Sequence, residues 1–246
     1  MNSFHLKIIA SVTMLIDHMS AVMPAVFGQA HRVVGRIAFP IYVFLIAEGF
    51  RHSKNPWKFM LRLGAFAIIS EPIFDFALGN DISFVRNTNI FYTLFLGGAA
   101  IIAYKYIIKY LDEKPGDSYF LTRQMVAISP AIPFMWIAEF LSTDYGAYGV
   151  IFILSMYVIK PKLFRLAVMA FFCVWQHRFT IQFFVENGLI YLNYNIYFVL
   201  MIPATLLAVV FVAFYNEKRG RDVKWFFYVF YPLHLGVLVL MREFVI

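Results

Sequence analysis

Long apolar runs separated by short polar stretches make up almost the entire chain. We mark nine of them, at about residues 6–26, 34–50, 58–78, 90–111, 124–141, 146–159, 163–184, 195–215 and 225–244. Runs of about 20 apolar residues can cross a bilayer as a helix. The pattern predicts an all-α fold, a polytopic transmembrane helix bundle of about nine spans, forming a single domain over residues 1–246. The two least regular runs are 146–159, which is short, and 163–184, which contains His177 and Arg178.

Composition supports a membrane protein and argues against a soluble one. Of the 246 residues, 62% are hydrophobic and 14% are charged, whereas soluble domains carry about 25% charged residues. The net charge of +7 does not indicate nucleic-acid binding, because the basic residues lie between the apolar runs. Cys173 is the single cysteine, which excludes an internal disulfide and a cysteine-based metal site. The histidines show no metal-binding spacing, so we expect no metal.

Basic residues gather in alternate connections between the runs. Most of the 21 lysines and arginines are Lys7 or lie in the connections at 51–62, 105–123, 160–165 and 217–224. Cytoplasmic loops of membrane proteins carry such an excess. The alternation therefore predicts a cytoplasmic N-terminus and a C-terminus outside.

Polar side chains occur inside these apolar runs, where they are costly. Asp17 and His18 stand side by side near the middle of the first run. An acid and an imidazole at this depth cost several kcal/mol unless they are paired or face a wet cavity, so they indicate a functional site. With about 1.5 Å of rise per residue, further polar residues fall between mid-depth and outer depth: Arg36, Glu48, Ser70, Glu71, Asp75, Asn89, Tyr92, Thr93, Tyr231 and His234.

An imidazole beside a carboxylate is the usual arrangement of a general base. In a chain without a cysteine nucleophile, serine elbow or phosphate-binding glycine loop, it suits deprotonation of an amine or hydroxyl that attacks an activated ester. Proton-coupled transport of a small molecule uses the same residue types, and a non-catalytic assembly factor is a third reading. Structural roles are also open: helix packing for His18, interface anchoring for Arg36 and Glu48, and a kink at Glu71–Pro72.

Several long strings resemble one known family. They are LKIIASVTMLIDHMSAVM, RVVGRIAFPIYVFLIAEGFRHSKNPWKFMLRLGAFAIISEPIFDFALG, NIFYTLFLGGA, DYGAYGVIFIL and FYVFYPLHLGVLVL. The chain resembles the TraX family of membrane proteins, whose namesake is associated with acetylating the N-terminus of a conjugative pilin. The family is similar to transmembrane acyltransferases, which take an acyl group from cytoplasmic acyl-coenzyme A. The resemblance implies a multi-pass protein of the bacterial cytoplasmic (inner) membrane.

The resemblance also implies roles for individual residues. The chemistry falls to His18, with Asp17 beside it in the IDH motif, and to His234 in FYPLH. We expect Asp17 or Glu71 to orient His18, while His234 or Tyr231 holds the thioester carbonyl. The substrate-binding set is expected to be Arg36, Glu48, Glu71, Asp75, Asn89, Thr93 and Tyr231. The phosphates of acetyl-coenzyme A, the acyl donor, are expected on Arg51, Lys54, Lys58, Arg62 and Lys224. Membrane lipids are further partners, and the acceptor is a protein, glycan or small molecule.

Overall fold

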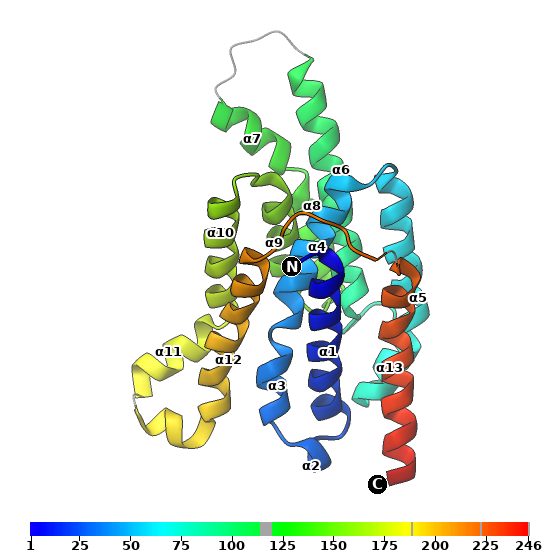
Figure 1. Cartoon of the computed structure of the whole chain (residues 1–246), viewed down its shortest axis with the longest axis vertical. Helices are drawn as coiled ribbons and strands as arrows, with labels where there is room; N and C mark the ends of the chain where they lie inside the picture. Colours follow the sequence, from blue (N-terminus) through cyan, green and yellow to red (C-terminus); the bar gives the residue numbers. More distant parts are fainter. Residues whose placement is uncertain (114–119, 188, 222, 246) are drawn as a thin grey trace. The chain divides into compact units, whose positions relative to one another are not determined.

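The computed structural model describes residues 1–113, 120–187, 189–221 and 223–245, and all regular elements in these ranges are α-helices (Figure 1). The predicted all-α class is confirmed. The helices are α1 Ser3–Val22, α2 Pro24–Phe27, α3 Ala30–Gly35, α4 Ala38–His52, α5 Pro56–Leu78, α6 Ile90–Asp112, α7 Phe120–Ile128, α8 Ala131–Phe140, α9 Gly146–Val158, α10 Lys162–Trp175, α11 Arg178–Asn187, α12 Leu189–Ala213 and α13 Lys224–Val245.

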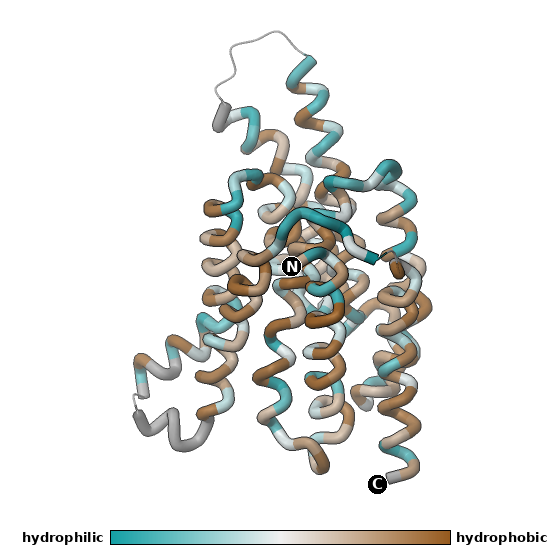
Figure 2. Tube along the Cα trace, viewed as in Figure 1, coloured by the Kyte–Doolittle hydropathy of each residue, from teal (hydrophilic) through white to brown (hydrophobic). Residues whose placement is uncertain are grey.

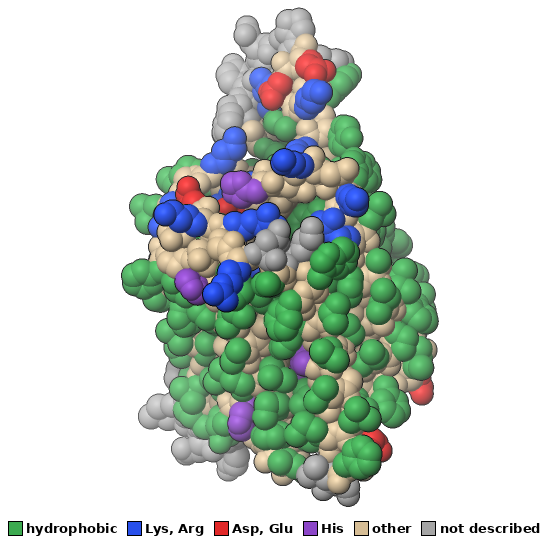
Figure 3. Space-filling model, turned by 45° about the vertical axis from the view of Figure 1, so that its right-hand side comes forward, with side chains coloured by type: hydrophobic (Ala, Val, Ile, Leu, Met, Phe, Trp, Pro, Cys, Tyr) green, Lys and Arg blue, Asp and Glu red, His purple; other side chains and the backbone are tan. Residues whose placement is uncertain are grey.

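Four segments of the described chain are long and apolar enough to cross a membrane: Ala30–His52, Ile90–Asp112, Ile196–Ala213 and Trp225–Phe244. They coincide with four of the nine predicted runs. Helices α1 and α5 are as long, with 20 and 23 residues, but charged side chains interrupt them. Hydrophobic residues line most helices in Figure 2 and cover broad areas of the face in Figure 3. An apolar surface of this kind fits a lipid environment.

Four of the predicted runs are not single helices. The run 6–26 breaks at Met23, the run 34–50 at Arg36–Ile37, the run 124–141 at Ser129–Pro130 and the run 163–184 at Gln176–His177. Pro24 and Pro130 disfavour the helical conformation of the residue before them, so two of the breaks have a local cause. The break at Gln176–His177 falls at the polar group that made this run irregular in the sequence. Apolarity alone therefore overestimated the continuity of these helices.

Internal contacts divide the chain into two compact units. Unit 1 comprises Met1–Leu45, Ile73–Asp81 and Lys160–Ile246, and unit 2 comprises Ile46–Pro72 and Ile82–Ile159. Helices α4 and α5 each contribute residues to both units. The single domain predicted over residues 1–246 stays a prediction.

In unit 1, α1 packs against α3 and α13, while α12 packs against α3, α10 and α11. The start of α1 is tied to the turn before α13, because the amide of Ser3 donates to the carbonyl of Lys218 at 2.9 Å and the amide of Asn216 donates to that of Met1 at 2.8 Å. The two helices therefore begin at the same end of the unit and run parallel (Figure 1). Their mid-helix residues consequently lie at one level.

In unit 2, α6 packs against α7, α8 and α9. Two adjacent glycines allow this close packing. A Cβ atom at Gly97 would lie 2.6 Å from Cδ1 of Ile153, and one at Gly98 would lie 2.5 Å from Cζ of Phe50. Small residues at helix interfaces commonly let apolar helices approach in this way in membrane proteins.

Candidate functional site

The central feature of unit 1 is a pair of histidines on neighbouring parallel helices. Nδ1 of His18 on α1 lies 2.6 Å from Nε2 of His234 on α13. The two ring planes differ by only 13°. Rings lying face to face cannot bring two atoms to 2.6 Å, so the rings are nearly coplanar and are joined edge to edge by a hydrogen bond. This contact confirms the prediction that His18 and His234 lie at the same level along their helices.

A backbone carbonyl sets the direction of this hydrogen bond. Nδ1 of His234 lies 2.7 Å from the carbonyl oxygen of Phe230, one helical turn earlier. A carbonyl can only accept, so Nδ1 of His234 carries the hydrogen, and its Nε2 is the acceptor in the neutral ring. His18 must then donate from Nδ1. In neutral His18, the lone pair is therefore on Nε2.

Tyr231 packs edge-on against both imidazoles. Its ring makes angles of 71° with His18 and 70° with His234, with centroids 5.8 and 5.6 Å away. Tyr231 and His234 are buried, whereas His18 is half-buried. Phe230 stacks on the other side of His234, with its ring plane inclined by 15°. The aromatic contacts hold both imidazoles in place.

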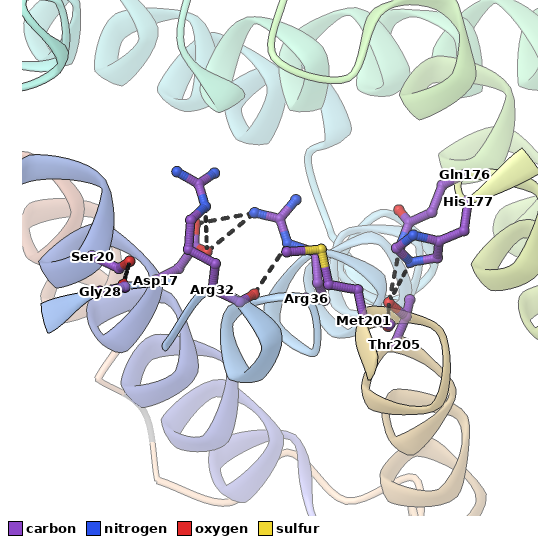
Figure 4. Close-up of polar contacts among 9 residues, drawn as sticks. All are labelled: Asp17, Ser20, Gly28, Arg32, Arg36, Gln176, His177, Met201 and Thr205. Atoms are coloured by element: carbon purple, nitrogen blue, oxygen red, sulfur yellow. Dashed lines mark hydrogen bonds and ion pairs between the residues drawn. The ribbon is translucent and has the colours of Figure 1, made fainter. Parts of the chain in front are cut away.

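Asp17 contacts arginines. Its carboxylate accepts hydrogen bonds from Nη2 of Arg36, at 3.1 and 3.4 Å, and forms an ion pair with Nε of Arg32 at 3.6 Å (Figure 4). The ring that is hydrogen-bonded to His18 is that of His234, and the expectation that Asp17 or Glu71 orients His18 stays a prediction. Adjacent residues of a helix point about 100° apart, which separates Asp17 from the imidazole hydrogen bond.

Gly35 makes room for the Asp17 side chain. A Cβ atom at Gly35 would overlap Cβ and the carboxylate of Asp17. Arg36, the C-cap of α3, also donates from Nε to the carbonyl of Arg32 at 3.3 Å. The end of α3, where the apolar run breaks, is thereby fastened to α1.

A second polar group of unit 1 was missed in the sequence. His177, in the break between α10 and α11, lies 2.9 Å from Oγ1 of Thr205 on α12, and Nε2 of Gln176 lies 3.1 Å from the same oxygen (Figure 4). Thr205 in turn donates to the carbonyl of Met201 at 2.7 Å. Because isolated polar residues give no periodic signal, only the break itself could have pointed to this group.

The remaining predicted substrate residue of unit 1 is Asp75. Its side chain is buried, and its backbone carbonyl accepts from the amide of Asn80 at 2.9 Å in the turn that ends α5. This backbone hydrogen bond places Asp75 in the turn that ends α5.

In unit 2, Glu71 and Asn89 form a buried network. Oε2 of Glu71 accepts from the backbone amide of Asn89 at 3.1 Å and also from its side-chain amide. Asn89 donates to the carbonyl of Ala67 at 2.8 Å, and its side-chain oxygen caps α6 by accepting from the amide of Phe91 at 2.9 Å. Both predicted site residues thus stabilise the start of α6.

Thr93 and Glu48 also have structural partners in unit 2. Thr93 donates to Thr143 at 3.0 Å. Glu48 accepts from Nη1 of Arg51 at 2.6 Å, and Nη2 of Arg51 lies within hydrogen-bonding distance of three carbonyls at the end of α9: Met156 at 2.8 Å, Tyr157 at 2.6 Å and Ile159 at 3.0 Å. Arg51 therefore satisfies carbonyls that have no partner within their own helix.

The other cations proposed to bind the acyl donor differ in exposure. Lys54 and Lys58 are exposed, and the half-buried Arg62 lies over the ring of Phe59 at 5.6 Å. The side chain of Lys224 lies outside the described residues. No cluster of three or more His, Cys, Asp or Glu residues positioned to hold a metal ion occurs in the described ranges.

The apolar helices and the buried polar groups define a helical membrane protein whose unit 1 contains a hydrogen-bonded histidine pair. The chain belongs to the TraX family, whose model, described as "TraX protein", matches residues 3–242. It is also similar to a protein of Dichelobacter nodosus named "Probable fimbrial assembly protein FimC, serogroup H1", with 27% identity over 262 residues that cover 99% of this chain and 96% of the relative. No solved structure matches.

Proposed function

We propose that this protein is a membrane-embedded acyltransferase that moves an acetyl or other short acyl group from acyl-coenzyme A to an amine or hydroxyl. The observation that carries the proposal is the directed chain from Phe230 through His234 to His18. It leaves a lone pair on Nε2 of His18, which is what a general base needs. Here His234 does the orienting that a carboxylate does in the familiar triads.

The proposed step balances as follows. Nε2 of His18 takes the proton from the acceptor N–H or O–H, and the acceptor atom attacks the thioester carbonyl. The C–S bond of the donor then breaks, and the departing sulfur takes the proton from Nε2. The products are the acylated acceptor and free coenzyme A, and His18 returns to its neutral tautomer. The His234 ring accepts from Nδ1 of His18 throughout, so the imidazolium is stabilised without leaving its position.

We propose that the donor phosphates bind the exposed lysines before and at the start of α5, Lys54 and Lys58, together with Arg62. Arg51 is a poor candidate for this role, because its guanidinium already contacts Glu48 and the end of α9. Arginine and lysine side chains of this kind bind phosphates by charge-assisted hydrogen bonds.

We also propose nine crossings of the bacterial inner membrane, with the N-terminus cytoplasmic and the C-terminus outside. The parallel course of α1 and α13 supports an odd number of crossings, and the basic loops carry the proposed orientation. An acceptor presented at the outer side, such as the N-terminus of a pilin-like protein, fits both the family and the name of the fimbrial relative.

The test uses the full chain purified into lipid nanodiscs. Acetyl-coenzyme A is titrated into wild type, His18→Ala and Lys58→Gln while the thermal unfolding midpoint is recorded, and transfer of labelled acetyl to membrane extract of a strain lacking the protein is measured. We expect saturable donor binding that Lys58→Gln weakens, and loss of transfer in His18→Ala without loss of donor binding. Full transfer by a folded His18→Ala protein would falsify the assignment.

A second candidate function, proton-coupled transport of a small molecule, is favoured by the same hydrogen-bonded histidines, because chains of ionisable groups relay protons in membrane transporters. Liposomes carrying the protein and a pH-sensitive dye separate the two. A transporter shows proton flux that depends on His18, whereas the acyltransferase shows none.

A further inference from the structure

We propose that Arg32 and Arg36 form an anion-binding site that holds a carboxylate or phosphate group of the acceptor. The assignment to the acceptor rests on the proposed function, but the presence of an anion site does not. The proposed anion site consists of side chains of α1 and of α3 with its C-cap, all within unit 1.

The first step is the local balance of charge. Two guanidinium groups share one carboxylate, that of Asp17, so the group of three carries one positive charge in excess. Such an excess within the membrane-spanning part of a protein is costly and commonly marks a substrate or ion pathway. A single anionic group would neutralise it.

The second step is the availability of hydrogen-bond donors. The ion pair of Arg32 joins Nε to Asp17 at 3.6 Å, which is too long for a hydrogen bond, and within the described ranges it is the one ion pair of this guanidinium. Its two terminal nitrogens point away from Asp17, on the side to which the Arg36 guanidinium also turns (Figure 4). Arginine presents its donors as a planar fork that matches the two oxygens of a carboxylate or phosphate.

The third step is rigidity. Asp17 cannot move toward α3, because Gly35 lies against its side chain, and Arg36 is fixed through the carbonyl of Arg32. Asp17 and the Arg36 guanidinium are thus held by contacts with the backbone of α3. A site whose donors are placed in advance pays less entropy when it binds.

The fourth step is position. Asp17 directly precedes His18, so the two arginines lie at nearly the same level along α1 as the proposed base, about 100° around the helix. An acceptor held on the arginines by an acidic group therefore extends around α1 to bring its amine or hydroxyl to Nε2 of His18. The competing explanation is that Arg32 and Arg36, with 35% and 21% of their side chains exposed, only anchor α3 at the membrane interface.

The test uses inorganic phosphate as the probe. The full chain is placed in nanodiscs of phosphatidylcholine, and its thermal unfolding midpoint is recorded against sodium phosphate, with sodium chloride at equal ionic strength as the reference. We expect saturable stabilisation by phosphate in wild type and at least about tenfold weaker binding in Arg32→Gln and Arg36→Gln. Arg32→Gln is the decisive variant, because Asp17 keeps its hydrogen bonds from Arg36. Arg86→Gln, which removes an exposed arginine from a loop of unit 2, is the matched control and should bind as wild type does.

A second arm replaces part of the lipid by phosphatidylglycerol. Stabilisation by this lipid together with no response to phosphate would assign the arginines to a lipid headgroup and overturn the acceptor site. The same holds for a response to phosphate that survives both arginine substitutions. His18→Ala should keep the phosphate response, so failure of acyl transfer and failure of the anion site are read separately.

Discussion

One backbone carbonyl, that of Phe230, sets the direction of the hydrogen bond between the two histidines. Phe230 accepts from His234, His234 accepts from His18, and the lone pair appears at Nε2 of His18. None of these three groups can reverse its role while the rings stay neutral. In the proposed mechanism, His234 is therefore a positioning residue for His18.

Removing the His234 ring should cost catalysis more than binding. We expect His234→Ala to lower kcat by about 100-fold, since a misplaced catalytic group loses roughly that factor, while affinity for acetyl-coenzyme A stays near wild type. His234→Gln should recover part of kcat, because the amide oxygen can accept from Nδ1 of His18. Equal kcat in the Ala and Gln variants would show that the ring contributes only packing.

The sequence predicts at which level along its helix a site residue lies, but not which side chain it contacts. The rise of a helix places His18 and His234 at one level from their sequence positions alone. Which neighbour a side chain meets depends on the rotation of each helix and on packing, which the sequence pattern does not contain. Asp17 was accordingly assigned to His18, while its carboxylate binds Arg36 and Arg32.

Among the elements, the contact between α1 and α3 depends on a residue with no side chain. Gly35→Ala should push Asp17 away from α3 and lower the free energy of unfolding by about 1–3 kcal/mol, the usual cost of overpacking. Gly236→Ala is the control within α13, since a Cβ there meets nothing within 4 Å, and alanine should stabilise the helix by about 0.5–1 kcal/mol. Thermal unfolding in one detergent measures both, and an equal response at the two sites would contradict the packing argument.

The end of α9 depends on Arg51. Arg51→Ala leaves Glu48, with 8% of its side chain exposed, without its guanidinium partner and the carbonyls of α9 without their donor. We expect a loss of about 3 kcal/mol in the free energy of unfolding, as for other broken buried pairs. Arg51→Ala combined with Glu48→Gln should recover part of it. The exposed Arg86→Ala change should alter the free energy of unfolding by no more than about 0.5 kcal/mol. A loss as large as that of Arg51→Ala would contradict the argument that Arg51 caps the end of α9.

Helix type was predictable throughout, but helix continuity was not. Apolar runs specify where helices form, because the lipid-facing and core-facing sides are both apolar. The breaks at Arg36–Ile37 and Gln176–His177 are set by tertiary hydrogen bonds to Asp17 and Thr205, which lie on other helices. The breaks at Met23, before Pro24, and at Ser129–Pro130 are the two that a local rule anticipates.

For the molecule as a whole, unit 1 makes the proposed orientation directly testable. Glu217 lies in the turn before α13, and Asp81 follows the end of α5. Arg242 lies near the other end of α13, and its Nη1 donates to the carbonyl of Ala77 in the last turn of α5 at 3.0 Å. Glu217 and Asp81 are therefore close to opposite ends of α13. The 22 residues of α13 span about 33 Å, enough to cross the hydrocarbon core. Asp81 and Glu217 are therefore expected on opposite sides of the membrane.

Cysteine labelling in intact cells checks this expectation. Cys173, the single native cysteine, is buried and is replaced by Cys173→Ala to give a background without thiols. In that background a membrane-impermeant maleimide should label Asp81→Cys in intact cells and Glu217→Cys only after permeabilisation. Both positions are exposed, so access to the reagent rather than burial decides the result. The reverse pattern would invert the orientation inferred from the basic loops, and labelling of both from outside would mean that α13 does not cross the membrane.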